Sequence, residues 1–193
     1  KSRARQFKVA EFAHGLTLQL PAYLLAVVRA RAGEGRPEPV PAGALYMNIL
    51  REVCTAVPGD LDKIERDEED ELKAHMARGF FDFAQCGLFD GEMKEGEPSS
   101  VVKMKIKQDG QPYKWSDACT DNGVAAILAW TKRCLREFAG RLAGGEVAVT
   151  PYQLGNRTPC TWCEFRPVCR FDAQLQPYRC LAGGLDLDWI REQ

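Results

Sequence analysis

The fold of this chain depends on the stretch CTWCEFRPVC, residues 160–169, in which three cysteines are spaced C-x2-C-x5-C. Cys160 and Cys163 can bind one side of a metal ion or cluster, and Pro167 helps the chain turn so that Cys169 can reach the same centre. Thiolates are soft ligands that select zinc or iron–sulfur clusters. A complete ligand shell of either kind needs a fourth donor, which this stretch does not supply. The spacing therefore predicts a zinc or cluster site that is completed from elsewhere.

The remaining cysteines bear on where that fourth donor lies. Eight cysteines in 193 residues could indicate a secreted disulfide scaffold, but they are scattered over a chain long enough to bury a core. A reducing compartment with a metal or cluster is the better interpretation. Cys180 is the nearest local candidate for a fourth ligand. Cys54, Cys86 and Cys134 lie among apolar neighbours and are expected to be small buried hydrophobes, whereas Cys119 has no evident partner.

Composition is that of an ordinary globular chain, with 45% hydrophobic and 27% charged residues. The net charge of −1 gives no global electrostatic case for nucleic-acid binding, so any such site has to be a local patch. No apolar run approaches the roughly 18–20 residues that span a bilayer. Position 1 is lysine and no signal-peptide pattern follows, so we expect a cytoplasmic protein whose numbering begins inside a longer chain.

Apolar spacing in the first half predicts one long helix followed by a strand. Residues 10–32 repeat apolar side chains at helical intervals, and Pro21 must kink that helix or lie in its first turn. A Gly- and Pro-rich loop over 33–41 and a buried strand over 42–50 come next. Residues 60–78 contain a run of acids and are expected to form a solvated helix or a mobile segment.

A β-hairpin is predicted for residues 101–115, with its turn at Asp109-Gly110. Apolar residues alternate on its first strand with Lys103, Lys105 and Lys107. These lysines, with the basic residues near position 1, could contact DNA phosphates, which would position DNA without reading its sequence. They are equally well explained as the solvent side of the hairpin, and the residues leave both interpretations open.

The second half is dominated by a long helix predicted over residues 122–143. Ser116, Thr120 and Asp121 offer N-caps, and Gly144-Gly145 end the helix. One face of it carries an apolar stripe of Val124, Ile127, Leu128, Thr131, Leu135, Phe138 and Leu142. An extended loop over 146–159 and a short terminal helix over 186–192 are also expected.

Two stretches together resemble a known nuclease family. Lys1-Ser2, followed by HGLTLQLPAYL at residues 14–24, looks like the end of a PD-(D/E)XK nuclease core, in which a lysine and a Q-x-x-x-Y helix follow acidic residues. The run from Thr150 through the three cysteines to Asp172 resembles the AddB type of bacterial ATP-dependent helicase/deoxyribonuclease. AGALY at 42–46 and the order of hairpin and long helix also fit this type, so the resemblance covers essentially the whole chain.

The resemblance implies an α/β fold: the later part of a RecB-like PD-(D/E)XK core over residues 1–150, then a cysteine-cluster loop and helix over 151–193. It implies that Lys1 is the catalytic lysine beside the scissile phosphate. Gln19 and Tyr23, which lie on one helix face at i and i+4, would brace the active site and the DNA backbone. The three cysteines of residues 160–169 would be ligands to a [4Fe–4S] cluster whose fourth cysteine lies upstream of the core.

The implied activity is Mg²⁺-dependent exonuclease action on DNA, with an AddA-type helicase/nuclease as partner in double-strand-break repair. In the family the carboxylates that hold Mg²⁺ precede Lys1, so we expect residues 1–193 alone not to cut DNA. Glu11 is interpreted as a solvated charge, His14 as structural and His75 as exposed. The alternatives are a zinc-stabilised nucleic-acid-binding module without catalysis, and a CRISPR-associated-type iron–sulfur exonuclease that needs no helicase.

Overall fold

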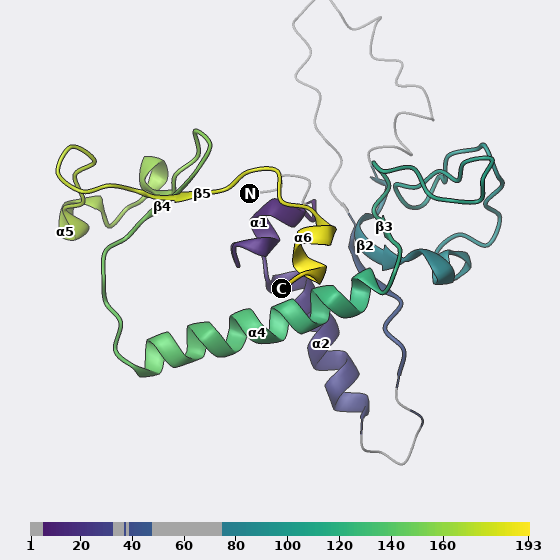
Figure 1. Ribbon diagram of the computed structural model, residues 1–193, viewed down its shortest axis with the longest axis horizontal. Coiled ribbons are helices and arrows are strands. Elements are labelled where there is room, and N and C mark those ends of the chain that lie inside the picture. The colour runs from purple at the N-terminus through teal and green to yellow at the C-terminus, as the bar shows by residue number, and fades with distance from the viewer. Residues whose placement is uncertain (1–5, 33–36, 38, 48–74) are drawn as a thin grey trace, which may run out of the picture. The chain divides into compact units, whose positions relative to one another are not determined.

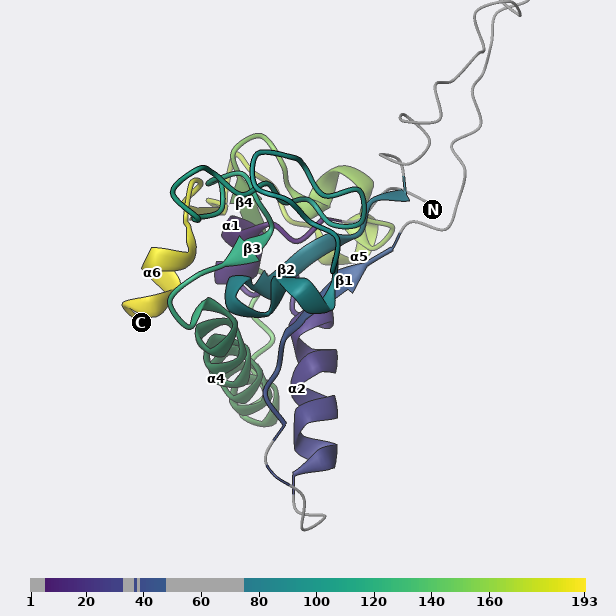
Figure 2. The ribbon, with the colours of Figure 1, turned by 90° about the vertical axis from the view of Figure 1, so that its right-hand side faces the viewer.

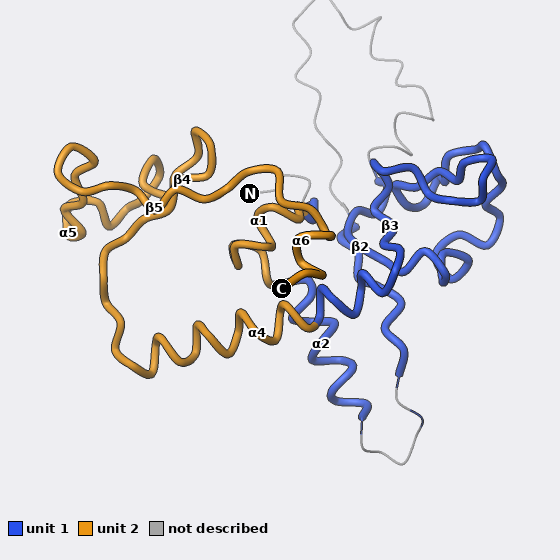
Figure 3. Tube along the Cα trace, in the orientation of Figure 1, with its two compact units in different colours: residues 1–7, 19–128 blue, residues 8–18, 129–193 orange. Residues whose placement is uncertain are grey.

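The computed structural model describes residues 6–32, 37, 39–47 and 75–193, which are coloured in Figure 1. The chain divides into two compact units, one of residues 1–7 and 19–128 and the other of residues 8–18 and 129–193 (Figure 3). Both units mix helix with strand, which confirms the predicted α/β class. No helix among the described residues is long and apolar enough to cross a membrane.

The first unit is built on a three-stranded sheet in the order β1-β2-β3. β1 (Gly43–Tyr46) runs antiparallel to β2 (Arg78–Asp82), and β3 (Ala118–Cys119) runs parallel to β2. Helix α2 (Gln19–Arg31) contacts β1, and Figure 2 shows the two side by side. The short 3-10 helix η2 (Phe83–Leu88) follows β2.

Two glycines allow β1 and β2 to approach closely. A Cβ on Gly79 would collide with the carbonyl oxygen of Ala44, and a Cβ on Gly43 would lie 2.5 Å from the Cα of Phe81. Gly43 also has φ +153°, a conformation that side chains rarely adopt. The strand predicted over 42–50 is confirmed, but it spans only Gly43–Tyr46 and is half-buried. Residues 48–50 lie outside the described part.

The core of the first unit lies between the sheet and the loop that follows it. Ala77, Phe81, Val102 and Met104 form a buried cluster. Phe80 is also buried, and its ring lies 4.8 Å from that of Phe7. Burying a side chain as large as valine, methionine or phenylalanine stabilises the folded state by about 1.5–3 kcal/mol. The acidic stretch predicted as a solvated segment lies, up to residue 74, outside the described residues.

The predicted hairpin is confirmed by its turn and its hydrogen bonds. Gly110 has φ +76°, and the Asp109 carboxylate accepts a hydrogen bond of 3.0 Å from the backbone N–H of Gln111. The strands meet through the N–H of Tyr113, which donates to the carbonyl of Lys105 at 3.1 Å. The pairing forms only an isolated antiparallel bridge, Ile106 with Pro112, rather than regular strands.

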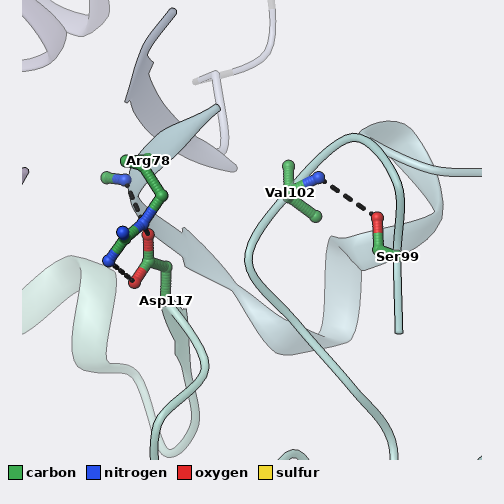
Figure 4. A network of polar contacts seen from close by, with 5 residues as sticks. Arg78, Ser99, Val102 and Asp117 are labelled. Atoms are coloured by element: carbon green, nitrogen blue, oxygen red, sulfur yellow. Dashed lines mark hydrogen bonds and ion pairs between the residues drawn. The ribbon is translucent and has the colours of Figure 1, made fainter. Parts of the chain in front are cut away.

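A half-buried ion pair fixes the base of this hairpin against β2. Arg78 Nε donates to Asp117 Oδ2 at 2.8 Å, and its Nη2 donates to Oδ1 at 3.3 Å (Figure 4). The same carboxylate accepts a 3.0 Å hydrogen bond from the N–H of Gly79. In the adjoining loop the Ser99 hydroxyl accepts from the N–H of Val102 at 3.1 Å, also drawn in Figure 4.

The second unit contains the part of α4 from residue 129 onward and the elements of the C-terminal segment. Trp130 Nε1 donates to the carbonyl of Ala13 at 3.2 Å, and its ring meets that of Trp189 edge-on at 5.3 Å. The elements of this unit, beyond the shared α4 (Gly123–Ala143), are α1 (Val9–Ala13), β4 (Tyr152–Leu154), η3 (Pro159–Trp162), α5 (Arg166–Cys169), β5 (Arg179–Leu181) and α6 (Leu187–Arg191). β4 and β5 form a parallel pair.

The long helix is confirmed almost residue for residue. α4 ends where predicted: Gly145 has φ +71°, and the N–H of Glu146 donates back to the carbonyl of Arg141 at 3.1 Å. The apolar stripe is correct only in its first turns. Leu135 is 41% and Leu142 76% exposed, whereas Cys134, three positions after the buried Thr131, is itself buried.

Two other predictions need correction. A single helix over 10–32 is wrong, because the chain breaks between α1 and α2, where Gly15 takes φ +73° beside the ring of Phe138. Pro21 lies in the first turn of α2, where a missing N–H costs nothing. The extended loop expected over 146–159 contains β4 and the start of η3, and the terminal helix is confirmed as α6, capped by Asp186.

We predict that Asp117→Asn destabilises the protein by about 2 kcal/mol, because the Arg78 guanidinium would lose its charged partner in a half-buried position. Chemical denaturation should show a lower midpoint with an unchanged slope. Asp109→Asn in the exposed hairpin turn is the control and should change stability by less than about 0.5 kcal/mol. Equal stability of Asp117→Asn and the parent protein would contradict the assigned role.

Candidate functional site

The predicted active-site pair lies at the start of α2. Gln19 Nε2 donates a hydrogen bond of 2.9 Å to Tyr23 Oη, so the two side chains meet on one face of the helix. Both are exposed, with Tyr23 at 61%. Side-chain pairs at i and i+4 of a helix stabilise it by about 0.2–0.5 kcal/mol. Lys1, the third residue of the predicted constellation, lies outside the described residues.

The cysteine stretch folds into two short helical turns joined by a bend. Thr158 caps η3, its hydroxyl accepting a 3.3 Å hydrogen bond from the N–H of Cys160. In α5 the N–H of Cys169 donates to the carbonyl of Phe165 at 2.8 Å. Arg170 then adopts φ +53°, which ends α5 and reverses the chain. The backbone of this stretch is therefore set by local hydrogen bonds and turns.

All three predicted ligand cysteines line one hollow of about 520 Å³ in the second unit. Cys160 is half-buried, and Cys163 and Cys169 are exposed. The other lining residues are Arg166, Arg170, Phe171, Asp172, Ala173, Gln174 and Tyr178. Within the described ranges, no three His, Cys, Asp or Glu side chains already stand close enough together to hold one metal ion. The thiols share a hollow without converging on a point.

The remaining cysteines are placed differently. Cys180 is exposed on β5 and is not among the residues that line the hollow. Cys119 is buried in β3, and Cys86 is half-buried against the core of the first unit. Burial, with a smaller contribution from the charge of Glu137, raises the pKa of the Cys134 thiol, which keeps it protonated. The buried-hydrophobe prediction is confirmed for Cys134, whereas Cys54 lies outside the described residues.

The hollow suits a thiolate-bound group in its chemistry. Its donors are three soft sulfur ligands, one short of the four that zinc or a cubane cluster takes. Two guanidinium groups, Arg166 and Arg170, line the same hollow and would offset the negative charge of bound thiolates. Sequence reasoning did not single out these arginines, although both flank Cys169 and so carried a signal.

Polar contacts tie the helix α1 to the C-terminal segment within the second unit. Arg157 Nη1 donates to Glu11 Oε1 at 2.6 Å, and Lys8 lies 3.5 Å from the same carboxylate oxygen. His14 Nε2 lies 2.8 Å from the carbonyl oxygen of Ala182, so the structural interpretation of His14 is confirmed. The interpretation of Glu11 as a solvated charge is wrong, because its side chain is only 15% exposed and is paired. His75 is exposed, as predicted.

The electrostatics of Glu11 make this contact dependent on pH. Burial opposes ionisation of the carboxyl, but the hydrogen bond and charge of Arg157, helped by Lys8, outweigh it and lower the pKa. A lowered pKa in the folded state means that the ion pair stabilises the protein above the unfolded-state value of about 4.3. That stabilisation is lost as the pH falls through the folded-state pKa.

We therefore predict that Arg157→Ala lowers the free energy of unfolding by about 1 kcal/mol at neutral pH, a modest effect because the guanidinium is largely exposed. Since the carboxyl loses its charge in acid, the difference should shrink as the pH falls below about 4. Denaturation of both proteins across this pH range is the measurement. Arg136→Ala, at an exposed position of α4, is the control, and a difference that persists unchanged in acid would contradict the assignment.

Comparison with known proteins places this architecture in a class. The PD-(D/E)XK nuclease superfamily matches the chain over residues 1–170, a range that includes Gln19, Tyr23 and the three clustered cysteines. The chain belongs to this superfamily. The predicted nuclease fold is thereby confirmed.

Curated relatives narrow the comparison to the AddB-type component of ATP-dependent helicase/deoxyribonucleases. The chain is 32% identical over 180 residues to this component from Symbiobacterium thermophilum, and the match covers 92% of the chain and 15% of that protein. The corresponding protein of Bacillus velezensis is 32% identical and that of Bacillus subtilis 30% identical, each over 100% of the chain and 17% of the relative. The predicted AddB-type resemblance is confirmed, and the chain spans about a sixth of these relatives' length.

Proposed function

We propose that this chain is part of the nuclease of a helicase–nuclease complex that processes DNA double-strand breaks for recombinational repair. One observation carries the proposal: a single chain of the PD-(D/E)XK superfamily contains both a hydrogen-bonded Gln19–Tyr23 pair and a hollow lined by three cysteines. The similarity to AddB-type helicase/deoxyribonucleases over the whole chain supports it. DNA in the cytoplasm is the substrate, and an AddA-type helicase/nuclease is the partner.

In this proposal the reaction is Mg²⁺-dependent hydrolysis of a phosphodiester bond. When bound, Mg²⁺ would supply an activated water and would offset the charge that develops on the phosphate. Lys1 supplies a cation beside that phosphate. Tyr23, held by the amide of Gln19, orients the DNA backbone from the exposed face of α2. In this proposal the carboxylates that bind Mg²⁺ belong to the part of the family core that precedes Lys1. Residues 1–193 alone are therefore proposed not to cut DNA.

Cys160, Cys163 and Cys169 would hold a [4Fe–4S] cluster, with a fourth cysteine from outside the stretch. A tetrahedral zinc site draws its thiolates to about 2.3 Å from a single ion, whereas each thiolate of a cluster binds a different iron. Thiols that line a hollow of about 520 Å³ suit the larger group better. The cluster's contribution would be structural, because closing a long chain loop removes entropy from the unfolded state.

Replacing Tyr23 tests the catalytic part of the proposal. Tyr23→Phe removes the hydroxyl that Gln19 contacts, and a hydrogen bond of this kind contributes about 1 kcal/mol. We expect kcat for Mg²⁺-dependent degradation of linear DNA by the full-length protein with its partner to fall by up to about tenfold. Val27→Ala, at another exposed position of α2, is the matched control. Absence of any Mg²⁺-dependent cleavage by the parent protein would refute the proposed activity.

The cluster is tested by metal analysis of cysteine variants. Cys163→Ala in the full-length protein should abolish bound iron and acid-labile sulfide, lower the thermal midpoint and weaken binding to DNA ends. Cys180→Ala should retain iron, because that residue is not among those lining the hollow. Zinc without iron or sulfide in the parent protein would favour the alternative of a zinc-stabilised nucleic-acid-binding module. Full cleavage without any helicase partner would favour the CRISPR-associated type.

A further inference from the structure

Two aromatic rings lie together on the exposed side of the hairpin in the first unit. The rings of Tyr113 and Trp115 are stacked, with centroids 5.7 Å apart and planes inclined by 28°. Lys114 and Trp115 lie in a turn that is closed by a 2.9 Å hydrogen bond from the N–H of Ser116 to the carbonyl of Tyr113. Tyr113 and Trp115 remain 37% and 46% exposed, which leaves much of two flat apolar surfaces open to solvent.

Three lysines from the opposite strand surround these rings. The Nζ of Lys103 lies 5.8 Å from the centroid of Trp115, and those of Lys105 and Lys107 each lie 5.8 Å from the centroid of Tyr113. In the part of the chain that the structure describes, none of the three forms an ion pair with a carboxylate. Their charges are therefore available to an anionic ligand.

The scaffold under this surface is held in place before any ligand arrives. Val102 and Met104, which alternate with the lysines, are buried in the core cluster. The N–H of Asp117 donates to the carbonyl of Lys103 at 2.8 Å, and the Asp117 carboxylate is held by Arg78. A rigid platform loses little conformational entropy on binding, which favours affinity.

We propose that the surface formed by Lys103, Lys105, Lys107, Tyr113 and Trp115 binds single-stranded DNA outside the catalytic residues. Exposed aromatic faces suit unpaired bases, because every base offers a stacking face whereas a duplex hides its faces between neighbouring pairs. Lysines beside the rings suit the phosphates that accompany each stacked base. The proposal takes the DNA interpretation of the lysine face, because the rings and the lysines together offer a stacking surface beside positive charge.

The proposal rests on the proposed nuclease function but is tested separately from it. Binding of fluorescein-labelled oligothymidine to the full-length protein is measured without divalent cations, so that no strand is cut. Trp115→Ala should weaken this binding by about tenfold, because stacking of one base is worth about 1–3 kcal/mol. Trp115→Phe, which keeps a ring, should retain most of the affinity. The affinity of Trp115→Ala for a blunt duplex of the same length should differ from that of the parent protein by less than about twofold.

The salt dependence of oligothymidine binding tests the role of the lysines separately. Lys105→Ala should reduce the slope of log affinity against log salt concentration by about 0.7, the value for one phosphate contact on a single strand. Lys94→Ala, an exposed lysine of the same unit that lies over neither ring, is the matched control and should leave the slope unchanged. Thermal midpoints of all variants establish that each remains folded.

Unchanged oligothymidine affinity in Trp115→Ala, or an equal loss for the duplex, would overturn the proposal. So would equal losses in Trp115→Ala and Trp115→Phe, since the ring itself would then not be responsible. Failure of Mg²⁺-dependent cleavage together with the expected oligothymidine results would refute only the nuclease function. The two proposals therefore fail independently.

Discussion

The described part of the first unit depends on one carboxylate. Asp117 accepts hydrogen bonds from the Arg78 guanidinium and from the N–H of Gly79, and so joins the end of the hairpin to the start of β2. Asp117 lies almost forty positions after both donors, so the contact closes a long loop. Its half-buried position strengthens the charge attraction while the extra backbone donor adds a hydrogen bond, which is how a buried charge becomes tolerable. The position of the proposed DNA-binding surface of the hairpin therefore depends on the Arg78–Asp117 ion pair.

The second unit uses the same device over a longer span. Glu11 on α1 is paired with Arg157, which lies just before η3, and the three clustered cysteines follow between residues 160 and 169. The ion pair thus anchors one end of the segment that carries the thiols, whereas Cys163 and Cys169 themselves stay exposed. A preformed thiolate site rarely exists before its group binds, so binding of a cluster would order these exposed donors as folding is completed.

Local chemistry made much of this fold predictable. The Asp109-Gly110 turn and the paired glycines after α4 are short-range signals, and the structure places both features where they were expected. Apolar spacing continues through the break between α1 and α2 and so does not reveal it, whereas in the structure Gly15 has a positive φ there and a Cβ would collide with Phe138. The predicted apolar stripe includes Leu135, which is 41% exposed, because the sequence does not show where the helix leaves its neighbours.

The sequence by itself determined the class of this protein and its chemically distinctive residues: the thiol spacing, the Gln19–Tyr23 register and the lysine alternation are all periodic or local patterns. Only the tertiary structure decided which of these residues share a surface. The stacking of Tyr113 on Trp115 beside the lysines follows from chain reversals that bring side chains together. Spacing along a chain cannot show such contacts, because they depend on how the backbone turns and on what each turn packs against.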